Sequence, residues 1–374
     1  MEVTRKVAAV ALTLVRGIGV KGALRVVALT DGKPERAFED RGAVGARDAR
    51  LGDLLARGAA GAVERARREL EWCGENGVEV VAWGEEGYPK RLRALKDAPV
   101  ALYCMGKANL GGERMVSVVG TRKPSAYGEE VCARIVGDLK AAGGGDVVVV
   151  SGLAYGIDVR AHRAALEEGL GTIAVLAHGA DRIYPDMHRD TAREMVERGG
   201  ALVTEYVRGT APERGNFICR NRLIAGLGAG TIVVESGRHG GALVTAGRAR
   251  EMERPVWAVP GRWGETQAEG CIDLIDRHEA RIYNGAEGVA KALGWTGTKR
   301  RTMRQGDLFE GTTDAKGQKV MDALRETDGA TAEEIGIKTG MGLREAATVL
   351  LRLEMEGKVR LLPGNVYKCP PGGG

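Results

Sequence analysis

The sequence predicts an α/β protein built around a doubly wound parallel sheet, with a small helical module before the sheet and a winged helix after it. Between about residues 114 and 294, short apolar runs alternate with amphipathic stretches, and Gly or Ser follows each run. Near-continuous apolar strands separated by helices indicate a parallel sheet covered on both faces, which binds its ligand beyond the carboxyl ends of the strands. The runs are MVSVVG (115–120), VVVVSG (147–152), TIAVLAHG (172–179), ALVTEY (201–206), TIVVES (231–236) and PVWAVPG (255–261).

The composition supports a globular protein of two or three domains. The chain has 374 residues, of which 44% are hydrophobic and 28% charged, as expected of a soluble protein. Its 57 glycines are about twice the usual share of roughly 7% and fall at junctions between apolar runs, which suits tight strand-to-helix turns. The net charge of +5 favours an anionic partner only mildly. The positions of the charges are therefore better evidence for such a partner than their sum.

Several classes of protein lack their usual markers. The six cysteines form no C-x-x-C pair and the five histidines no H-E-x-x-H motif, so neither a zinc site nor a disulfide framework is expected. The first apolar run is too short for a membrane span and has no small-residue cleavage site. We expect a cytoplasmic protein without metal, cofactor or membrane association.

The N-terminal module is expected over residues 1–80. Apolar residues recur there at helical spacing, with Gly and Asp breaks. The stretch from Arg16 to Gly22, RGIGVKG, resembles the turn of a helix-hairpin-helix or SAM-like module, whose amides approach a phosphate. A plain turn between two packed helices is the alternative.

The C-terminal part is expected to form a linker over 297–316 and a winged helix over 317–370. The linker is polar and carries a basic run that is either solvated or in contact with phosphates. Three helical segments and two short strands follow it. The third helix carries Arg344 and Arg352, but also Glu345, Glu354 and Glu356, so protein contact or regulation remains as open as duplex binding.

Between these parts lies the Rossmann-like domain, expected over 81–296, and four of its loops should meet at one edge of the sheet. In the first loop, Gly120, Thr121 and Arg122 precede a helix that begins near Ser125. Backbone amides, a hydroxyl and a guanidinium at a helix N-terminus can bind an anion, although the same residues also suit an ordinary tight turn. The chain has neither G-x-G-x-x-G nor G-x-x-x-x-G-K-[ST], which argues against dinucleotide binding and ATP hydrolysis.

In the second loop, SGLAYGID (151–158), Asp158 is expected to cap the following helix. His162 has no recognisable base partner or nucleophile, so no catalytic role is expected for it.

The third loop, APERGNFICRNR (211–222), places one of the chain's three phenylalanines among arginines. If a helix begins at Arg220, then Arg220 and Arg222 occupy its first turn, where cations oppose the macrodipole unless a phosphate is bound. Phe217 then suits base stacking, and the alternative is a local hydrophobic anchor. In the fourth loop, RHGGALVT (238–245), paired glycines suit close approach of a phosphate and Thr245 can donate a hydroxyl.

Together these segments resemble the DNA-processing protein A family (DprA, also called Smf). The resemblance covers about residues 87–276. It is carried by GYPKRLRALKDAPVALYCMG (87–106), VVGTRKPSAYG (118–128), SGLAYGIDVRAH (151–162), GTIAVLAHGADRIYP (171–185), EYVRGTAPERGNFICRNRLIAGL (205–227), VVESGRHGGALVTA (233–246) and VWAVPG (256–261).

The resemblance implies a homodimeric protein that binds and protects single-stranded DNA and loads the RecA recombinase in natural transformation. It also implies a set of nucleic-acid-binding residues with no catalytic member. The predicted contacts are Gly120, Thr121, Arg122, Gly152, Arg214, Asn216, Phe217, Arg220, Asn221, Arg222, Gly240, Gly241 and Thr245.

The chain departs from the family pattern near the fifth predicted strand. It reads Gly240-Gly-Ala-Leu-Val-Thr-Ala246 where the family commonly has S-G-S-L-I-T-A, and Ile272 stands where the family often has Asn. Two hydroxyls are lost, so backbone amides would have to replace them. Ile218 and Cys219 also make the segment before the Arg-Asn-Arg run less basic than the family pattern.

Two further functions compete with single-strand binding. A nucleotide phosphoribohydrolase would need a carboxylate after its glycine-rich turn, but Arg248 lies near that place and Glu251 is a helical turn further on. A duplex-binding regulator would act through the winged helix, and deleting that unit would then abolish DNA binding.

Overall fold

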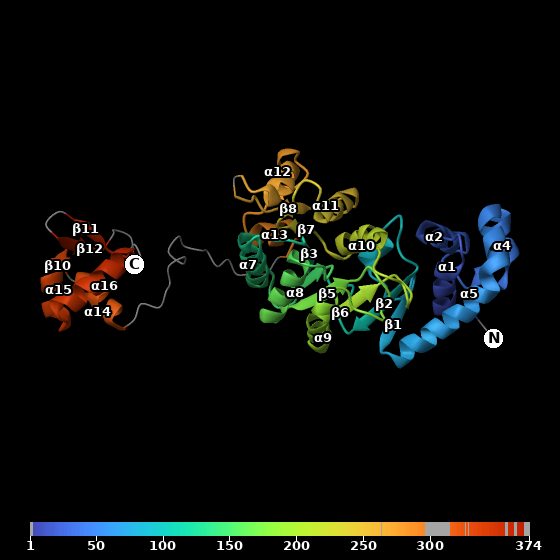
Figure 1. The fold of residues 1–374 in the computed structure, drawn as a ribbon, viewed down its shortest axis with the longest axis horizontal. Coiled ribbons are helices and arrows are strands. Elements are labelled where there is room, and N and C mark those ends of the chain that lie inside the picture. The colour runs from blue at the N-terminus through green and yellow to red at the C-terminus, as the bar shows by residue number, and fades with distance from the viewer. Residues whose placement is uncertain are drawn as a thin grey trace. The chain divides into compact units, whose positions relative to one another are not determined.

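The computed structural model describes residues 3–262, 264–295, 315–325, 327, 329–355, 358–362 and 365–369. The chain divides into two compact units, Met1–Thr298 and Lys299–Gly374 (Figure 1). Most of the predicted linker, residues 297–314, lies outside the described residues. Its last two positions, 315 and 316, begin a helix of the second unit instead.

The N-terminal module is helical, as predicted, through residue 75. Thr4 caps the first helix and Asp48 the last, and the buried faces of these helices form one apolar cluster that includes Leu12 and Leu55. Gly17 has φ +91° in the RGIGVKG turn between the first two helices, a conformation that favours glycine. The helices are α1 (Arg5–Leu14), α2 (Val20–Leu29), α3 (Arg36–Glu39), α4 (Arg41–Arg47) and α5 (Ala49–Glu75).

The described residues of the first unit form one sheet with the strand order β1-β2-β6-β5-β4-β3-β7-β8-β9. The six predicted runs are the parallel strands β3 to β8. The order of the strands reverses at β3, which pairs with β4 on one side and with β7 on the other. The strands are β1 (Val78–Ala82), β2 (Ala101–Gly106), β3 (Met115–Val119), β4 (Val148–Ser151), β5 (Gly171–Val175), β6 (Ala201–Thr204), β7 (Thr231–Val233), β8 (Val256–Ala258) and β9 (Arg281–Ile282).

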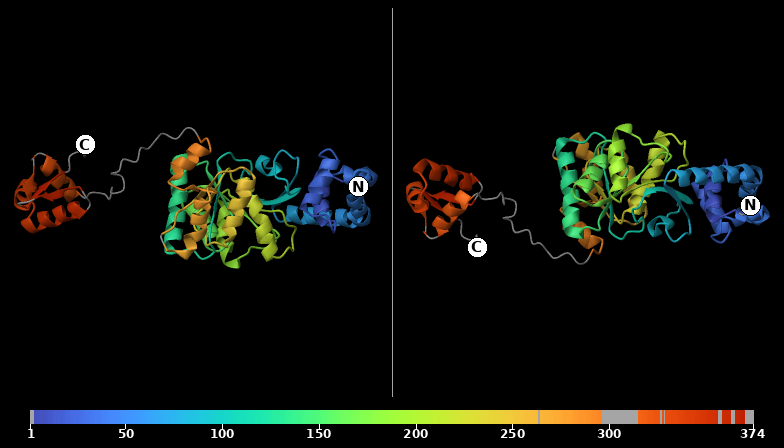
Figure 2. Two further views of the ribbon diagram at one scale, coloured as in Figure 1. Left: turned by 90° about the horizontal axis from the view of Figure 1, so that it is seen from above. Right: turned by 90° about the horizontal axis from the view of Figure 1, so that it is seen from below.

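Helices cover both faces of this sheet, as a doubly wound fold requires (Figure 2). On one face, Leu223 of α10 and Ala246 of α11 pack in the same core as Val150 and Ile173 of the sheet. On the other face, α7, α8 and α13 bury a second core against β3 and β4. The helices are α6 (Lys90–Arg93), α7 (Ala126–Gly143), α8 (Ile157–Glu167), α9 (Arg189–Glu197), α10 (Arg214–Leu227), α11 (Gly241–Glu251), α12 (Glu269–Asp276) and α13 (Ala286–Ala292).

Three strands of the sheet were not predicted. β1 and β2 pair antiparallel with each other, and β2 pairs antiparallel with β6. Val80 and Tyr103 on these two strands pack under the N-terminal helices, whereas Leu102 packs in the core beside α10. The third strand, β9, is only two residues long and exposed.

The second unit is a winged helix, as predicted. Val320, Ile335 and Leu350 form its core, and Thr331 and Glu334 make a capping box at the second helix. Its described strands form a small sheet in the order β10-β12-β11, of which β10 was not predicted, and Glu356 lies outside the described residues. The elements are α14 (Ala315–Arg325), β10 (Ala330–Thr331), α15 (Ala332–Thr339), α16 (Leu343–Met355), β11 (Arg360–Leu362) and β12 (Val366–Lys368). Within the described parts of both units, no helix is long and apolar enough to span a membrane.

Candidate nucleic-acid interface

The four loops meet at the carboxyl edge of the sheet, as the sequence predicts. The amide of Thr121 donates to the carbonyl of Glu235 at 2.7 Å, and the amide of Ile157 donates to the carbonyl of Thr121 at 3.1 Å. The side-chain amide of Asn221 donates to the carbonyl of Gly241 at 3.3 Å. These bonds join the turns after β3, β4 and β7 to helix α10, so the edge is a single surface.

The glycines of this edge serve two different purposes. A Cβ on Gly120 would lie 2.5 Å from Ile157, and a Cβ on Gly152 would lie 2.6 Å from the guanidinium of Arg220. These two glycines therefore allow the loops to pack against each other. A Cβ on Gly241 would meet open space, so its backbone is accessible at the start of α11.

A carboxylate of the protein itself already occupies the N-terminus of α7. Glu235 is buried and accepts hydrogen bonds from the amide of Ser125 at 2.9 Å and from its hydroxyl at 2.8 Å. Ser125 in turn caps the helix by accepting from the amide of Gly128. Glu235 therefore engages the N-cap residue of this helix, so neither the amide nor the hydroxyl of Ser125 is free for an anion at the Gly120–Arg122 turn.

Phe217 lies half-buried at the centre of a cationic and aromatic cluster. The guanidinium carbon of Arg122 is 5.0 Å from the centroid of its ring, and that of Arg220 is 5.7 Å away. Tyr184 meets the same ring edge-on, at 5.9 Å between centroids. Phe217 thus agrees with both alternatives from the sequence. It is a local anchor because it packs against its neighbours, and its ring is still partly exposed for base stacking.

Helix α10 begins at Arg214, six residues earlier than the sequence suggested. Arg220 and Arg222 are therefore not in its first turn, and the macrodipole argument applies to Arg214 instead. Arg214 and Arg122 are both exposed and remain the cations of the predicted set that a phosphate can reach. Asn216 is half-buried, and its side chain donates to the carbonyl of Ala211 at 3.0 Å.

Arg220 is only 2% exposed and binds the sheet rather than facing solvent. One of its nitrogens donates to the carbonyl of Gly152 at 2.8 Å and to that of Val175. Burial lowers the pKa of Arg220 to about 10, although the nearby carboxylate of Asp158 opposes this shift. The predicted phosphate contact by Arg220 is corrected accordingly, since this side chain positions α10 against the ends of β4 and β5.

The side chain of Arg222 is likewise buried. Its Nη2 lies 2.5 Å from Oε2 of Glu205, and its Nε lies 3.5 Å from a carboxylate oxygen of Asp97. Burial raises the pKa of Glu205, and the attraction of Arg222 works against that rise. The predicted phosphate contact by Arg222 is also corrected, because both of its charged partners belong to the protein.

Thr245 is 1% exposed, so its hydroxyl is not available to a ligand, contrary to prediction. At the start of the same helix, Gly240 is the N-cap residue, and among the described residues no side chain caps this terminus. Arg238 forms ion pairs with Glu269 and Asp273. The fourth loop therefore offers backbone amides rather than the predicted hydroxyl.

The second loop holds two buried titratable groups. Asp158 lies in the first turn of α8, where Gly156 rather than Asp158 is the N-cap residue, and burial raises its pKa while Arg220 opposes the rise. Nδ1 of His162 lies 2.7 Å from the hydroxyl of Thr172, and burial lowers the pKa of His162 to about 3. His162 is therefore a neutral core residue at physiological pH.

Sequence reasoning missed three residues of this edge. Glu235 ends the predicted strand TIVVES, and its role at α7 has no separate signal in the sequence. Tyr155 and Tyr184 lie in the loops after β4 and β5 and are each 41% exposed. Their place in the loops that follow predicted strands was the signal that could have identified them.

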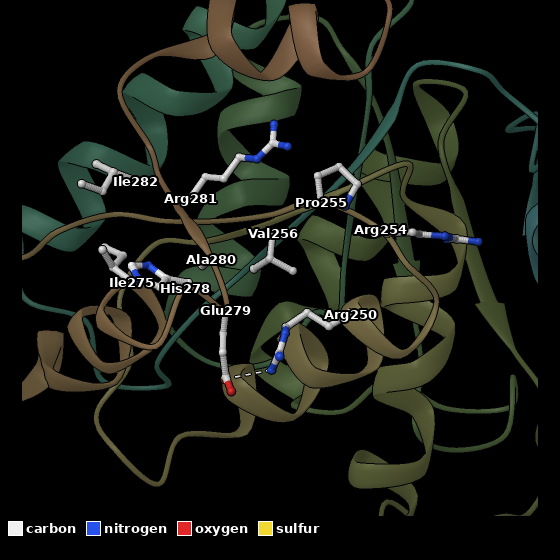
Figure 3. Close-up of a pocket in the computed structure, with 10 residues that line it drawn as sticks. All are labelled: Arg250, Arg254, Pro255, Val256, Ile275, His278, Glu279, Ala280, Arg281 and Ile282. Carbon is white, nitrogen blue, oxygen red and sulfur yellow. Dashed lines mark ion pairs between the residues drawn. The ribbon is translucent and has the colours of Figure 1, made fainter.

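A pocket of about 660 Å³ lies at the opposite ends of the strands, where Pro255 leads into β8 and Arg281 begins β9 (Figure 3). Two of the arginines that line it are already engaged. Arg250 pairs with Glu279 at 2.9 Å, and Arg254 donates to three carbonyls at the end of α10. This pocket is not part of the candidate interface.

The fold and this edge define a Rossmann-like α/β protein with an appended winged helix. Residues 79–294 match the family model described as DNA recombination-mediator protein A, and residues 310–365 match the DprA winged helix domain. The chain therefore belongs to the DNA recombination-mediator protein A (DprA) family.

Individual relatives agree with this assignment. The chain is 33% identical to protein Smf of Escherichia coli over 301 residues, which cover 80% of this chain and 79% of that protein. It is 36% identical to the DNA processing protein DprA of Bacillus subtilis over 220 residues, which cover 59% of this chain and 72% of that protein.

Two solved structures are similar. The DprA structure from Streptococcus pneumoniae has a TM-score of 0.63 and 29% identity, covering 78% of this chain and 98% of that one. A Helicobacter pylori structure, which describes the single-stranded DNA binding mode of that protein's DprA, has a TM-score of 0.51 and 27% identity over 58% of this chain and 95% of that one.

Proposed function

We propose that this chain binds single-stranded DNA with little dependence on sequence, using Phe217 to stack a base while Arg122 and Arg214 contact phosphates. The observation that carries the proposal is the half-open ring of Phe217, flanked by a guanidinium at 5.0 Å, on the carboxyl edge of the sheet. Single strands are generally bound by this combination of aromatic platforms and cationic side chains, because every base has a stacking face.

The backbone completes the proposed site. Gly240 and Gly241 present the uncapped start of α11, and Gly120 and Thr121 hold Arg122 beside Phe217. Asn216 and Asn221 order the neighbouring turns through their bonds to backbone carbonyls. In this proposal Gly152, Arg220, Arg222 and Thr245 support the fold of the site and do not contact DNA.

A gel shift with a single-stranded oligonucleotide and its duplex, at two salt concentrations, tests the proposal. The full chain should retard the single strand preferentially, and its affinity should fall as salt rises, because phosphate contacts release counterions. Equal retardation of duplex and single strand would contradict it.

The cellular role we propose is that of the family: a cytoplasmic homodimer that protects incoming single strands and loads RecA during natural transformation. Support comes from the family membership and from the names of the relatives. RecA filament formation on protein-coated single strands, measured with and without this chain, tests the loading step. Sedimentation of the free chain tests the dimer.

We propose a binding protein rather than a nucleotide hydrolase. Glu251 lies at the far end of α11 from its glycine-rich start, and its carboxylate pairs with Arg248 at 2.8 Å. It is therefore poorly placed to act at a ribose bound by those glycines. Release of free base from nucleoside monophosphates above background would contradict this assignment.

The winged helix is not expected to supply the main DNA contact. Leu343 and Leu351 are both exposed on α16, and their spacing places them on similar sides of the helix. Aliphatic side chains there are poor partners for a phosphate backbone. Deleting residues 315–374 should leave most single-strand affinity intact, whereas loss of all binding would favour a duplex-binding regulator.

A further inference from the structure

Two tyrosines at the carboxyl edge are unusually open to solvent. Tyr155 and Tyr184 are each 41% exposed, and no other Phe, Tyr or Trp in the described parts of the chain reaches that level. Aromatic rings dominate the energetics of cores and interfaces, so leaving two of them open forgoes apolar burial. Both occur in loops that follow parallel strands, and Tyr184 contacts the proposed stacking residue Phe217.

Each of these two rings contacts another ring at this edge. The planes of Tyr184 and Phe217 are inclined by 62° at 5.9 Å, so the rings do not cover each other face to face. Tyr155 meets His188 at 5.4 Å with an inclination of 67°. His188 lies four residues after Tyr184 in the same loop and is held by the carbonyl of Leu153. The rings therefore come from helix α10 and from the loops after β5 and β4.

Tyr155 also adjoins the turn that carries Arg122. The next residue, Gly156, has φ +76°, and a Cβ there would lie 2.3 Å from the carbonyl oxygen of Thr121. The backbone of the second loop is thus in close contact with the Gly-Thr-Arg turn. A strand that passes Arg122 and Phe217 would meet one of the two tyrosines next.

The charges in the loop of Tyr184 are largely matched. Arg182 pairs with Asp181 at 2.9 Å, and Arg189 pairs with Asp186. Met187 lies between Asp186 and Arg189 in the sequence, and its exposed thioether adds apolar surface. Paired charges attract phosphates weakly, whereas exposed rings and a thioether suit the faces of unpaired bases.

We propose that Tyr184 and Tyr155 form a second base-stacking surface, which receives the bases that follow the one on Phe217 in the same DNA strand. This inference rests on the proposed function, because it extends the same site. The occupant is single-stranded DNA rather than a protein, since the surface is continuous with the ring of Phe217 and the guanidinium of Arg122. It contributes stacking and little net charge.

The test compares Tyr184→Ala and Tyr184→Phe with the unchanged full chain on oligothymidylates of increasing length. With long oligonucleotides, Tyr184→Ala should weaken binding about five- to 150-fold, which corresponds to the usual cost of losing one stacked base. Tyr184→Phe should bind as the unchanged chain does, because the ring is retained. The slope of affinity against salt should not change in either variant, since no phosphate contact is removed.

One control variant and three outcomes decide between the possibilities. Ile337→Ala removes an exposed apolar side chain from the winged helix and should change nothing. If Tyr184→Ala and Tyr155→Ala both bind as the unchanged chain while Phe217→Ala is weakened, the second surface is refuted and the proposed function stands. If the unchanged chain does not bind single strands, both fail. An equal loss in Tyr184→Phe and Tyr184→Ala would also refute stacking.

A second measurement does not depend on affinity. Photocrosslinking with 5-iododeoxyuridine placed along the oligonucleotide should attach DNA to peptides that contain Tyr184 or Tyr155, as well as to the peptide of Phe217. Crosslinks confined to the Phe217 peptide would overturn the second surface.

Discussion

Replacing Arg222 by methionine tests whether this guanidinium serves the fold or the DNA. Arg222 and Glu205 each expose only 5% of their side chains, and their closest atoms are 2.5 Å apart. Removing one partner of a buried pair leaves an uncompensated charge, which generally costs about 3–5 kcal/mol. Asp97 is 26% exposed and can be rehydrated, so its pairing adds little to that figure. The free energy of unfolding of the first unit should therefore fall by about 3–5 kcal/mol.

The pH dependence of this variant has a definite sign. Burial already raises the pKa of Glu205, and loss of Arg222 removes the attraction that opposes the rise. In Arg222→Met the folded chain then holds a proton that the unfolded chain has released. Stability should therefore fall as pH rises from the unfolded pKa of Glu205 to its folded pKa, and the defect should be smallest in acid.

Urea unfolding followed by circular dichroism, at about pH 5 and about pH 8, measures both effects. The double variant Arg222→Met with Glu205→Leu is the matched control, because it removes both buried charges and should recover much of the stability. A single variant with unchanged unfolding but weaker and less salt-dependent single-strand binding would refute the reasoning. Arg222 would then be a phosphate contact after all.

Three further changes probe the edge itself. Phe217→Ala should cost about 1–3 kcal/mol of single-strand affinity in a fluorescence titration, and unchanged binding would remove the ring from the site. Arg214→Ala should lower the slope of log affinity against log salt by about 0.7, whereas Arg248→Ala, an exposed arginine paired with a glutamate, should leave that slope unchanged. Gly156→Ala forces a side chain into a positive φ and should destabilise the chain by about 1–3 kcal/mol in urea, while Gly241→Ala, where a Cβ meets open space, should be tolerated. Equal stability of the two glycine variants would contradict this account.

The parallel core of the fold could be predicted because its strands are buried on both faces and read as continuous apolar runs. β1 and β2 escaped prediction for a different reason. Their burial depends on the N-terminal helices, which cover Val80 and Tyr103 on one face, and this tertiary contact leaves no period in the local sequence. β9 is too short and exposed to show any pattern.

In the candidate site, residue types could be predicted but burial could not. Gly215 and Asn216 read as loop residues, so the start of α10 was placed at Arg220 instead of Arg214. Because the helix starts earlier, Arg220 and Arg222 lie beyond its first turn, and their inferred roles changed. Glu205, which neutralises Arg222, stands 17 residues away in the sequence, so only the folded chain shows that this charge is already matched.

The bonds from Arg220 to the ends of β4 and β5 have a consequence for the energetics of binding. Phe217 stands one helical turn before Arg220 on α10, so the ring cannot be displaced far without pulling a buried guanidinium from two carbonyls. The ring of Phe217 is thus in place before any DNA binds. The conformational entropy lost on binding is therefore mainly that of the flexible DNA strand. Changes at this ring should consequently act on the lifetime of the complex far more than on the rate at which it forms.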